Sequence, residues 1–412
     1  MIASSSSRVW IAGVGMTTFG VHHELTNHDL ARWAVRSALS DAGAELTSID
    51  AAFFGTASHG FLERQVMVSG QIALRTMGFH SIPVYNVENA CATGATALNL
   101  AVTQVRSGAA DIALAVGAEK MHVGDPRRTM ELFDTAYDVS DPAALLRTLK
   151  ELGGEVDDED VGRRSIFMDI YAALARNHMR LYGTTQAQLA AVAAKNHAHA
   201  ADNARAHYRK SMTIADVLRA RKLAHPLTVP MCAPVTDGAA AVVVCNDDGL
   251  RRLGAERPVQ VLATVLGTGS DHDLTSFDAH ITLRVAANAY ERAGIGPDDV
   301  DVAEVHDATA FGELLQTELL GLVPRGEGGL AAWRGETTLG GRIPVNPSGG
   351  LESKGHPLAA TGLGQVFELT EQLRGTAGSR QVPGARIALA ENGGGFHLGE
   401  EAVASVIILG SR

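Results

Sequence analysis

The chain contains the apolar run Ile112-Ala113-Leu114-Ala115, and Ile387-Ala388-Leu389-Ala390 repeats it near the C-terminus. Apolar runs without polar alternation are typical of strands that are covered on both faces of a sheet. Four further pairs of segments recur in the same order, with steadily growing separation, so we expect an internal duplication. The pairs are Val9–Gly13 with Val259–Ala263, Ala42-Gly43 with Ala293-Gly294, Ile82–Asn86 with Ile343–Asn346, and Ala95-Thr96 with Ala360-Thr361.

Both halves alternate short strands with helices. In the segment after Cys91, for example, apolar residues recur at helical intervals, which places them on one face of a helix. This alternation predicts a layered α/β architecture, here a duplicated five-layered fold of two βαβ halves related by a pseudo-dyad. We expect an N-terminal half over 1–121 and 233–257, an inserted helical domain over 122–232, and a C-terminal half over 258–412. The insertion should contain helices over 165–182 and 186–207 and an acidic run at 157–160, either as a solvated cap or as a cover for substrate.

Composition restricts the function classes. The 412 residues are 46% hydrophobic with a net charge of −11, which excludes a disordered chain and argues against nucleic acid or an anionic membrane as the main partner. No apolar run approaches the roughly 18 residues of a membrane span, and the N-terminus does not resemble a signal peptide. Three cysteines give neither a disulfide framework nor a four-cysteine zinc site, and they fit a reducing cytoplasm.

One cysteine stands out by its place in the repeat. When residues are counted along the repeat, Cys91 corresponds to His356. Each of the two follows a strand and begins a helix. The N–H groups at a helix N-terminus should lower the pKa of the thiol and keep His356 neutral, which predicts a nucleophile and its base. The alternative is that Cys91 is only a small buried hydrophobe. Cys232 and Cys245 have no such setting and are expected to be structural.

Two further turns follow strands in the second half. One begins at His306-Asp307, and the other is the glycine-rich run from Glu391 to Phe396. Glycines let backbone N–H groups approach a ligand closely. An N–H of this run together with the N–H of Cys91 would form an oxyanion hole.

These residues resemble the thiolase superfamily, and most closely its sterol-carrier-protein-x branch. The resemblance covers nearly the whole chain. It implies the duplicated thiolase fold, an inserted domain over the coenzyme A site, and a homodimer or higher oligomer. The matching segments are Asn89–Gly94, Asp237–Ala240, His306-Asp307 and Asn346–Pro357.

The resemblance also implies a mechanism. Cys91, activated by His356, would take an acyl group from a thioester, with no permanently bound cofactor, coenzyme A as a substrate and no metal. One oxyanion hole would use the N–H of Cys91 with that of Gly393 or Gly394. The other would use His356 with a group held near His306.

The chain departs from the family at one place, the second cysteine that serves as acid and base. The two family positions hold Ala308 and Glu391 instead. Proton transfer would then fall to His306, to His356 or to one of three other side chains. For one of the three, His59, a packing role is the simpler explanation. The three are Glu391, Asp307 and His59. Thiolase-like proteins without this cysteine often act with a small zinc-ribbon/OB-fold partner, which we therefore expect as a possible subunit.

The sequence thus favours a cysteine-dependent acyl-CoA C-acyltransferase that cleaves a branched or aromatic β-ketoacyl-CoA by thiolysis. Two alternatives stay open within this fold: a retro-aldol lyase, and an acyltransferase that works in the condensing direction. A non-catalytic acyl-CoA-binding subunit is the least favoured, because Cys91 and His356 are both present.

Overall fold

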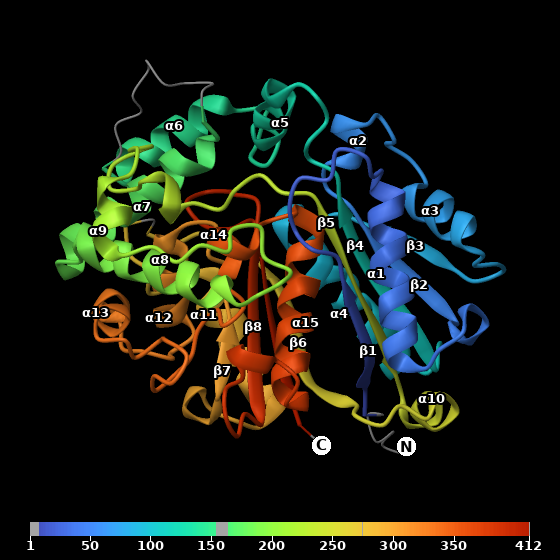
Figure 1. Cartoon of the computed structure of the whole chain (residues 1–412). Helices are drawn as coiled ribbons and strands as arrows, with labels where there is room; N and C mark the ends of the chain where they lie inside the picture. The colour runs from blue at the N-terminus through green and yellow to red at the C-terminus, as the bar shows by residue number, and fades with distance from the viewer. Residues whose placement is uncertain (1–7, 154–163, 274, 412) are drawn as a thin grey trace.

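A computed structural model describes residues 8–153, 164–273 and 275–411. In this part of the chain the strands form one mixed sheet of nine strands, in the order β3-β2-β4-β5-β1-β6-β9-β8-β7 (Figure 1). The strands are β1 (Trp10–Met16), β2 (Ala51–Gly55), β3 (Val84–Val87), β4 (Ile112–Glu119), β5 (Gly238–Cys245), β6 (Val259–Thr268), β7 (Val302–Glu304), β8 (Ile387–Gly394) and β9 (Val403–Gly410).

The duplication predicted from the sequence is present in the sheet. β2 and β4 run parallel in the first half as β7 and β8 do in the second, and β5 and β9 return antiparallel. Val345 makes a parallel bridge to Ala303 at the place where β3 lies in the first half. The halves join through a short antiparallel pairing of β1 with β6, where Trp10 faces Gln260 and Ile11 faces Val259.

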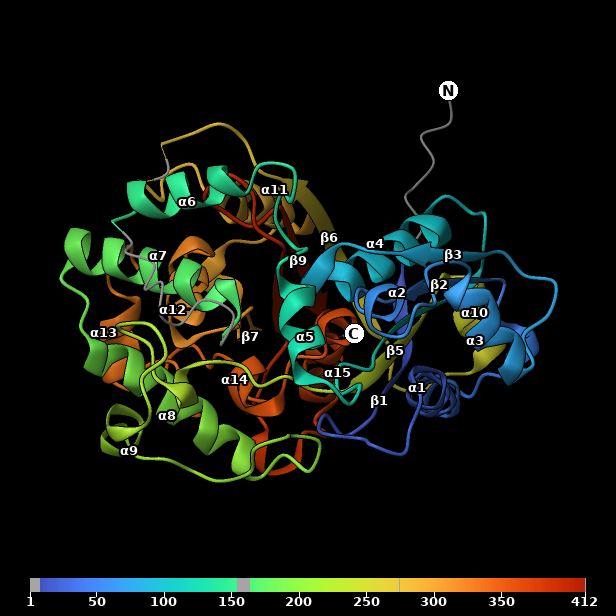
Figure 2. The ribbon, with the colours of Figure 1, turned by 90° about the horizontal axis from the view of Figure 1, so that it is seen from above.

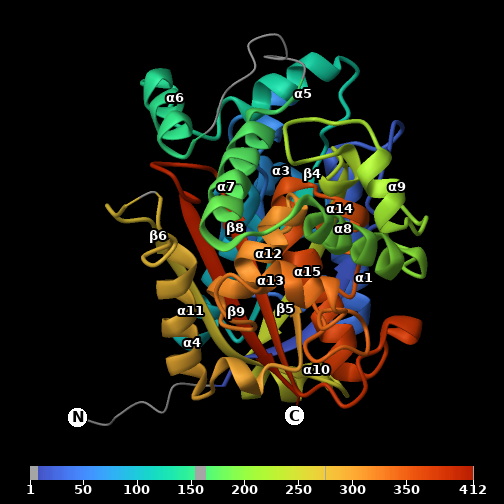
Figure 3. The ribbon, with the colours of Figure 1, turned by 90° about the vertical axis from the view of Figure 1, so that its left-hand side faces the viewer.

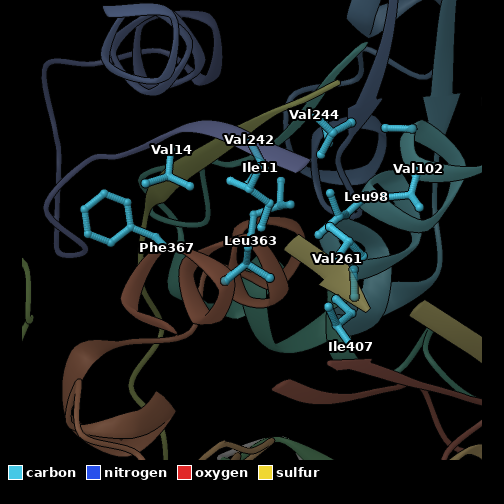
Figure 4. Packing of buried hydrophobic residues seen from close by; sticks show 14 of the residues in the cluster. Ile11, Val14, Leu98, Val102, Val242, Val244, Val261, Leu363, Phe367 and Ile407 are labelled. Atoms are coloured by element: carbon cyan, nitrogen blue, oxygen red, sulfur yellow. The ribbon is translucent and has the colours of Figure 1, made fainter. Parts of the chain in front are cut away.

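Helices form the other layers. α1 (Asn27–Ala42) covers the outer face of the first half, and α11 (Ile281–Ala293) covers that of the second. Between the two half-sheets lie α4 (Thr93–Arg106) and α15 (Thr361–Arg374), so the layers alternate as predicted for a five-layered fold (Figure 1 and Figure 3). The central core packs side chains of these two helices against both half-sheets (Figure 4). It includes Ile11, Val14, Leu98, Val102, Val242, Val244, Val261, Leu363, Phe367 and Ile407.

The ends of the two outer helices explain the repeated Ala-Gly pair. Thr26 caps α1 and forms a capping box with Asp29. Gly43 and Gly294 end α1 and α11 with φ of 63° and 70°, a left-handed conformation that glycine adopts without steric cost. The same stop signal therefore ends the equivalent helix in each half.

The inserted segment leaves the sheet after β4 and forms a helical cap over one end of it, seen from above in Figure 2. This end lies opposite the one where β1 begins and β9 ends (Figure 1). The predicted helix over 165–182 is confirmed, with Ser165 as its N-cap. The helix predicted to reach His207 ends at Ala201, because the next residues leave the helix and the N–H groups of His207 and Tyr208 bond to carbonyls of Lys354 and Ser353. The acidic run at 157–160 lies outside the described residues. The cap contains α5 (Pro126–Phe133), α6 (Pro142–Glu151), α7 (Ile166–Tyr182), α8 (Gln186–Ala201) and α9 (Ile214–Arg219).

The remaining helices are short or follow strands of the two halves. None of the helices in the described ranges is both long and apolar enough to span a bilayer. They are α2 (His59–Leu62), α3 (Ser69–Met77), α10 (Asp247–Leu253), α12 (Ala310–Leu319), α13 (Gly328–Trp333) and α14 (Gly350–Lys354).

Glycines allow the two halves to meet closely at the centre. The short 3-10 turn η6 (Leu358–Ala360), which precedes α15, packs its Ala359 carbonyl against Gly94 of α4 and Gly117 of β4. A Cβ atom at Gly94 would lie 2.3 Å from this oxygen, and one at Gly117 would lie 2.0 Å from it. Any side chain at these two positions would therefore push the halves apart.

We predict that Gly117→Ala lowers the free energy of unfolding by about 3 kcal/mol, because the rigid carbonyl of Ala359 cannot move away from the added methyl group. Urea denaturation followed by circular dichroism measures the loss. The matched control is Gly296→Ala, where the nearest atom to an added Cβ lies 3.9 Å away. An unfolding midpoint of Gly117→Ala equal to that of the unaltered chain would show that the two halves are not held this tightly.

Candidate active site

The candidate site lies at the carboxyl ends of the parallel strands, where loops from both halves converge. β3 leads to Cys91, β7 leads to His306, and β8 leads into the glycine run. The inserted domain begins after β4, at the same edge of the sheet, and covers it. Together these segments enclose a cavity of about 710 Å³ lined by Cys91, His306 and His356.

Cys91 lies in the 3-10 turn η2 (Ala90–Ala92), directly before α4. Ala90 has φ of 47°, an uncommon left-handed conformation for alanine. The turn is held by Glu88, whose carboxylate accepts the N–H of Ala90 at 2.6 Å, and by Thr93, whose hydroxyl accepts the N–H of Asn89. These bonds keep the strained backbone in place and present the sulfur to the cavity.

His356 is oriented as a base toward Cys91. Its Nε2 lies 3.2 Å from Cys91 Sγ, and its Nδ1 lies 2.7 Å from Thr361 Oγ1. The hydroxyl of Thr361 donates its own hydrogen to the carbonyl of Pro357 at 3.0 Å. Oγ1 must therefore accept from Nδ1–H of His356, which leaves the Nε2 lone pair facing the thiol.

The protonation state of the pair differs from the sequence-based prediction in one respect. Burial raises the pKa of the Cys91 thiol to about 12, and the charges of Glu119 and Glu88 add to this. Bonds from the N–H of Gly395 and of Cys91 itself oppose the rise without overcoming it. The predicted lowering of the thiol pKa is therefore wrong for the resting protein, because desolvation exceeds the field of the turn.

The prediction that His356 stays neutral is confirmed. Burial, and then the neighbouring His306, hold the pKa of His356 well below its ordinary value. The helix field was the expected cause, but desolvation is the larger one. The resting pair is thus a neutral thiol facing a neutral imidazole.

The pairing of Cys91 with His356 across the repeat is shifted by three residues. α4 and α15 both start at a threonine, Thr93 and Thr361, and both have 14 residues. Cys91 is therefore structurally equivalent to Ala359, and His356 lies three residues earlier. The two side chains still meet, because the loop before α15 brings the imidazole back over the nucleophile turn.

His306 is the third member of the cluster. Its ring packs edge-on against that of His356, with centroids 5.2 Å apart, and one ring nitrogen, Nδ1, lies 2.9 Å from Asn392 Nδ2. The sulfur of Cys91 and one ring nitrogen each of His306 and His356 all lie within 4.8 Å of one another. Burial lowers the pKa of His306 to about 4, although Glu401 opposes this shift.

The glycine run borders the cavity as expected. Gly393, Gly394 and Gly395 line it. The first two are the last residues of strand β8. Within this run, the N–H that bonds to the Cys91 sulfur is that of Gly395, which has φ of 64°. An oxyanion formed on an acyl group at Cys91 would therefore meet Gly395 as well as the two predicted glycines.

The three other predicted proton-transfer groups do not line the cavity. Glu391 is buried and accepts the N–H of His306 at 2.9 Å, and Asp307 is buried and accepts the N–H groups of Leu351 and Glu352. Burial raises the pKa of both carboxyls well above the ordinary value. These two carboxyls position the loops around His306 and do not face a substrate.

His59 is also away from the cavity. It is buried at the start of α2, 3.5 Å from Glu63, with its ring edge-on to that of His28. Burial lowers the pKa of His59 to about 4. A packing role fits this placement, as the sequence already suggested.

Cys232 lies closer to the site than the sequence indicated. The backbone of Cys232 forms an isolated antiparallel β-bridge with that of Thr309. The N–H of the next residue, Ala233, donates to the carbonyl of Ala308, which occupies one of the two family positions of the second cysteine. Cys232 lines the cavity together with Ala233 and Ala308, although little of its side chain is exposed. Its Sγ lies 3.6 Å from the carbonyl of Thr228 and packs in the core of the cap, which supports a structural role.

Sequence reasoning missed two carboxyl groups. Glu119, at the end of β4, accepts N–H groups of Ala57, Ser58 and Ala359 and has a pKa raised by burial to about 7. Glu401, before β9, lines the cavity. Neither stands in a recognisable motif. The only signal for Glu119 was a charged residue at the end of an apolar strand, and Glu401 had none.

Most of the cavity wall is apolar and comes from the cap. Phe133 of α5 and Phe167 of α7 pack edge-on, with ring centroids 6.4 Å apart. Phe133 also packs with Cys91 around one small apolar cluster. The other apolar wall residues include Met130, Leu132, Met168, Tyr171, Leu223 and Phe396.

Two family models match the chain. The model described as "Thiolase, N-terminal domain" matches residues 9–224, and the one described as "Thiolase C-terminal domain-like" matches residues 267–411.

Curated relatives match over nearly the whole chain. An acetyl-CoA acetyltransferase of Methanothermobacter thermautotrophicus is 39% identical over 94% of this chain and 96% of its own length. Sterol carrier protein 2 of Bos taurus is 36% identical over 95% of this chain and 72% of its own. The benzoylsuccinyl-CoA thiolase subunit BbsB of Thauera aromatica is 35% identical over 94% and 95%.

Among solved structures, one named "Ltp2-ChsH2(DUF35) aldolase" is similar with a TM-score of 0.79 and 24% identity over 98% of each chain. At this identity the likeness concerns the fold alone.

We predict that alkylation of Cys91 by iodoacetamide becomes about tenfold faster with each pH unit between 7 and 9. The reason is that the thiolate is the reacting form, and its fraction rises tenfold per unit at any pH below the raised pKa. Mass spectrometry of the Cys91 peptide measures the rate. Cys245, which is buried in the core of the first half and does not line the cavity, serves as an internal control that stays unlabelled. A rate that is already constant near pH 7 would mean that Cys91 and His356 rest as an ion pair.

Proposed function

The chain belongs to the thiolase family, and on that premise we propose that it is an acyl-CoA C-acyltransferase that cleaves a branched or aromatic β-ketoacyl-CoA by thiolysis. One observation carries the proposal: Cys91 Sγ lies 3.2 Å from a histidine nitrogen that is fixed as an acceptor, at the floor of a cavity of about 710 Å³. A nucleophile within hydrogen-bond reach of an oriented base is the arrangement that covalent acyl transfer requires.

The first half-reaction uses this pair directly. His356 Nε2 takes the proton of Cys91, and the thiolate attacks the ketone carbon of the substrate. The bond between that carbon and the α-carbon breaks, and the α-carbon takes the proton that His356 received from Cys91, which releases acetyl-CoA. The N–H groups near the sulfur, from Cys91 and Gly395, stabilise the negative oxygen that forms on the attacked carbon.

The second half-reaction releases the acyl group. The thiol of coenzyme A loses its proton to a basic group, and its sulfur attacks the thioester carbon on Cys91. The bond from that carbon to Sγ breaks, and Sγ takes up the proton that the basic group received. This sequence needs a second acid/base group besides His356, and His306 lies beside the reacting atoms.

The shape and polarity of the cavity support a bulky apolar acyl group. Phe133 and Phe167 form an aromatic wall, and Phe133 packs in the same cluster as Cys91. A flat ring or branched chain gains more from such a wall than a two-carbon unit does. The relative named benzoylsuccinyl-CoA thiolase also acts, by its name, on an aromatic thioester.

The rim of the cavity supports binding of the phosphates of coenzyme A. Tyr208 and Arg221 of the cap line it. Exposed basic side chains flank them, namely Arg209, Lys210 and Lys222. This local positive charge suits an anionic ligand even though the chain as a whole is acidic.

A retro-aldol lyase is the second candidate, favoured by the absence of the second cysteine and by the fold that the chain shares with a structure named as an aldolase. A lyase of this kind has no need of a cysteine with a dedicated base. The arrangement of Cys91, His356 and Thr361 therefore favours acyl transfer.

We predict that incubation with an aromatic β-ketoacyl-CoA adds the mass of its acyl group to Cys91, because the neutral pair becomes a thiolate and imidazolium when the substrate carbonyl accepts the sulfur. Intact-protein and peptide mass spectrometry measure the adduct. Acetoacetyl-CoA should be a poorer substrate, with kcat/KM about tenfold lower.

The matched control is Cys91→Ala, which should retain its fold and lose the adduct. Undiminished turnover in Cys91→Ala would contradict acyl transfer. Cleavage of a β-hydroxyacyl-CoA without added coenzyme A would establish the lyase instead.

We also propose that the chain forms a dimer or a higher oligomer and binds a small zinc-ribbon/OB-fold subunit. The edge strand β3 exposes Tyr85, and the loop of Val66, Met67 and Val68 is apolar and exposed. Unpaired edge strands and apolar patches are common contact surfaces. One relative is named as a subunit, and the similar solved structure is named for Ltp2 together with ChsH2(DUF35).

Light scattering should give at least twice the mass of one chain, and Tyr85→Asp should lower that mass by placing a charge on the paired edge. A monomeric mass for the unaltered chain would contradict the dimer. Trp33→Asp, at an exposed site on α1, is the matched control. Stoichiometric co-elution with a zinc-ribbon protein from the same source tests the partner.

A further inference from the structure

The proposed reaction needs a second acid/base group, and His306 is placed for it but is buried. Burial alone disfavours the charged imidazolium, so an isolated His306 would be a weak base. The groups that face it can change this. From the nucleophile turn and the loop before α15 these are Cys91 and His356, and from β8 and the following hairpin they are Glu391 and Glu401.

Glu401 is the carboxylate of the cavity wall that is shielded from water. Three acidic side chains line the cavity in the described part of the chain. Glu88 and Asp138 are exposed, whereas the side chain of Glu401 is 12% exposed. Its stem packs against Gly393, where a Cβ atom would lie 2.7 Å from Glu401 Cγ. The absence of a side chain at Gly393 thus makes room for this carboxylate beside the glycine run.

The carboxylate of Glu401 is held by the side chains of Gln316 and His280. Gln316 Nε2 donates to its Oε1 at 3.0 Å, and His280 Nε2 lies 3.0 Å from its Oε2. The other nitrogen of His280, Nδ1, accepts the N–H of Thr282. A ring hydrogen of His280 therefore sits on Nε2, the nitrogen nearer to Glu401.

The ionised form of Glu401 is the stable one in this setting. Burial works against it, but the charge interaction with His280, followed by a hydrogen bond from His280, outweighs burial and holds the pKa of Glu401 below its ordinary value. Among the ion pairs of the described residues, the basic partner of Glu401 is His280. The negative charge of Glu401 also acts on the neighbouring His306, and Tyr171 of α7 lies within its field too.

Asn392 gives His306 a partner that fits both charge states. Its Oδ1 is buried without a hydrogen-bond partner, while its Nδ2 lies 2.9 Å from His306 Nδ1. The oxygen and nitrogen of a carboxamide can exchange places by a half-turn. After that turn Oδ1 accepts from Nδ1–H, and the lone pair of His306 Nε2 becomes available to the cavity.

We propose that Glu401 supplies the negative charge that makes His306 the second acid/base group, with Asn392 bonded to the ring in its neutral and its charged state. The inference rests on the proposed acyl transfer and adds two positioning residues to it. In the second half-reaction, the thiol of coenzyme A gives its proton to His306 Nε2, its sulfur bonds to the acyl carbon, and the bond to Cys91 Sγ breaks. His306 then returns this proton to Cys91 Sγ, which restores the neutral site.

The test is Glu401→Gln, which keeps the size of the side chain and removes its charge. The imidazolium of His306 then loses a favourable interaction, so its pKa falls. In the unaltered protein the rate of acyl-enzyme with coenzyme A should rise with pH through the pKa of His306. In Glu401→Gln this acid limb should move to lower pH by about one unit, and the plateau should fall about tenfold because the base is weaker.

A readout without turnover separates this inference from the proposed function. The 15N signals of the His306 ring, assigned with His306→Gln, should titrate about one pH unit lower in Glu401→Gln than in the unaltered chain. Glu401→Asp, which keeps the charge but withdraws it by one methylene group, should give a smaller shift in the same direction. Glu131→Gln, an exposed carboxylate on α5, should give none.

Unchanged titration of His306 in a folded Glu401→Gln or Glu401→Asp variant would overturn the inference, and thermal unfolding checks the fold. If no acyl group ever forms on Cys91, the proposed function fails while the titration still measures the effect of Glu401 on His306.

Discussion

The close contact between the two central helices is the constraint on which the site depends. The carbonyl of Ala359 packs against Gly94 and Gly117 so closely that neither position has room for a side chain. Gly362 of α15 packs in the same way against α4. Cys91 and His356 belong to the turns directly before these helices. Because a hydrogen bond between thiol and imidazole tolerates only a few tenths of an ångström, the absence of side chains at these glycines is what brings the two halves of the site together.

Burial then sets the charges of the site. The same desolvation that raises the pKa of Cys91 lowers that of His356 and His306, so the resting cluster is neutral. A neutral resting state avoids an uncompensated charge in a cavity with largely apolar walls. Charge separation then becomes favourable only when a substrate oxygen can take up the negative charge beside the N–H groups of the nucleophile turn and of Gly395.

The sequence was sufficient for the fold because the repeat is carried by buried strands and helix stops, which leave direct marks such as the Ala-Gly pairs. It was also sufficient for Cys91 and His356, since each lies in a specific motif. It could not place the two exactly, because a loop of different length before α15 shifts the alignment by three residues. The pKa of Cys91 depends on how deeply the cap buries it, and Glu401 depends on the space left by Gly393. Both are tertiary effects without a local pattern.

Each half contains a buried carboxyl that accepts backbone N–H groups of a neighbouring loop. In the first half, Glu119 accepts the N–H groups of the loop after β2 and that of Ala359, and so ties the first half to the turn before α15. In the second half, Glu391 accepts the N–H of His306 in the equivalent loop after β7. Burial raises the pKa of both carboxyls. The two carboxyls stand at different positions of the equivalent strands, since Glu119 ends β4 whereas Glu391 lies in the middle of β8, so each half holds its loop with a carboxyl of its own. Only the loop of the second half carries a histidine at the cavity. The half that lacks the histidine keeps the nucleophile, so neither half alone contains a complete site.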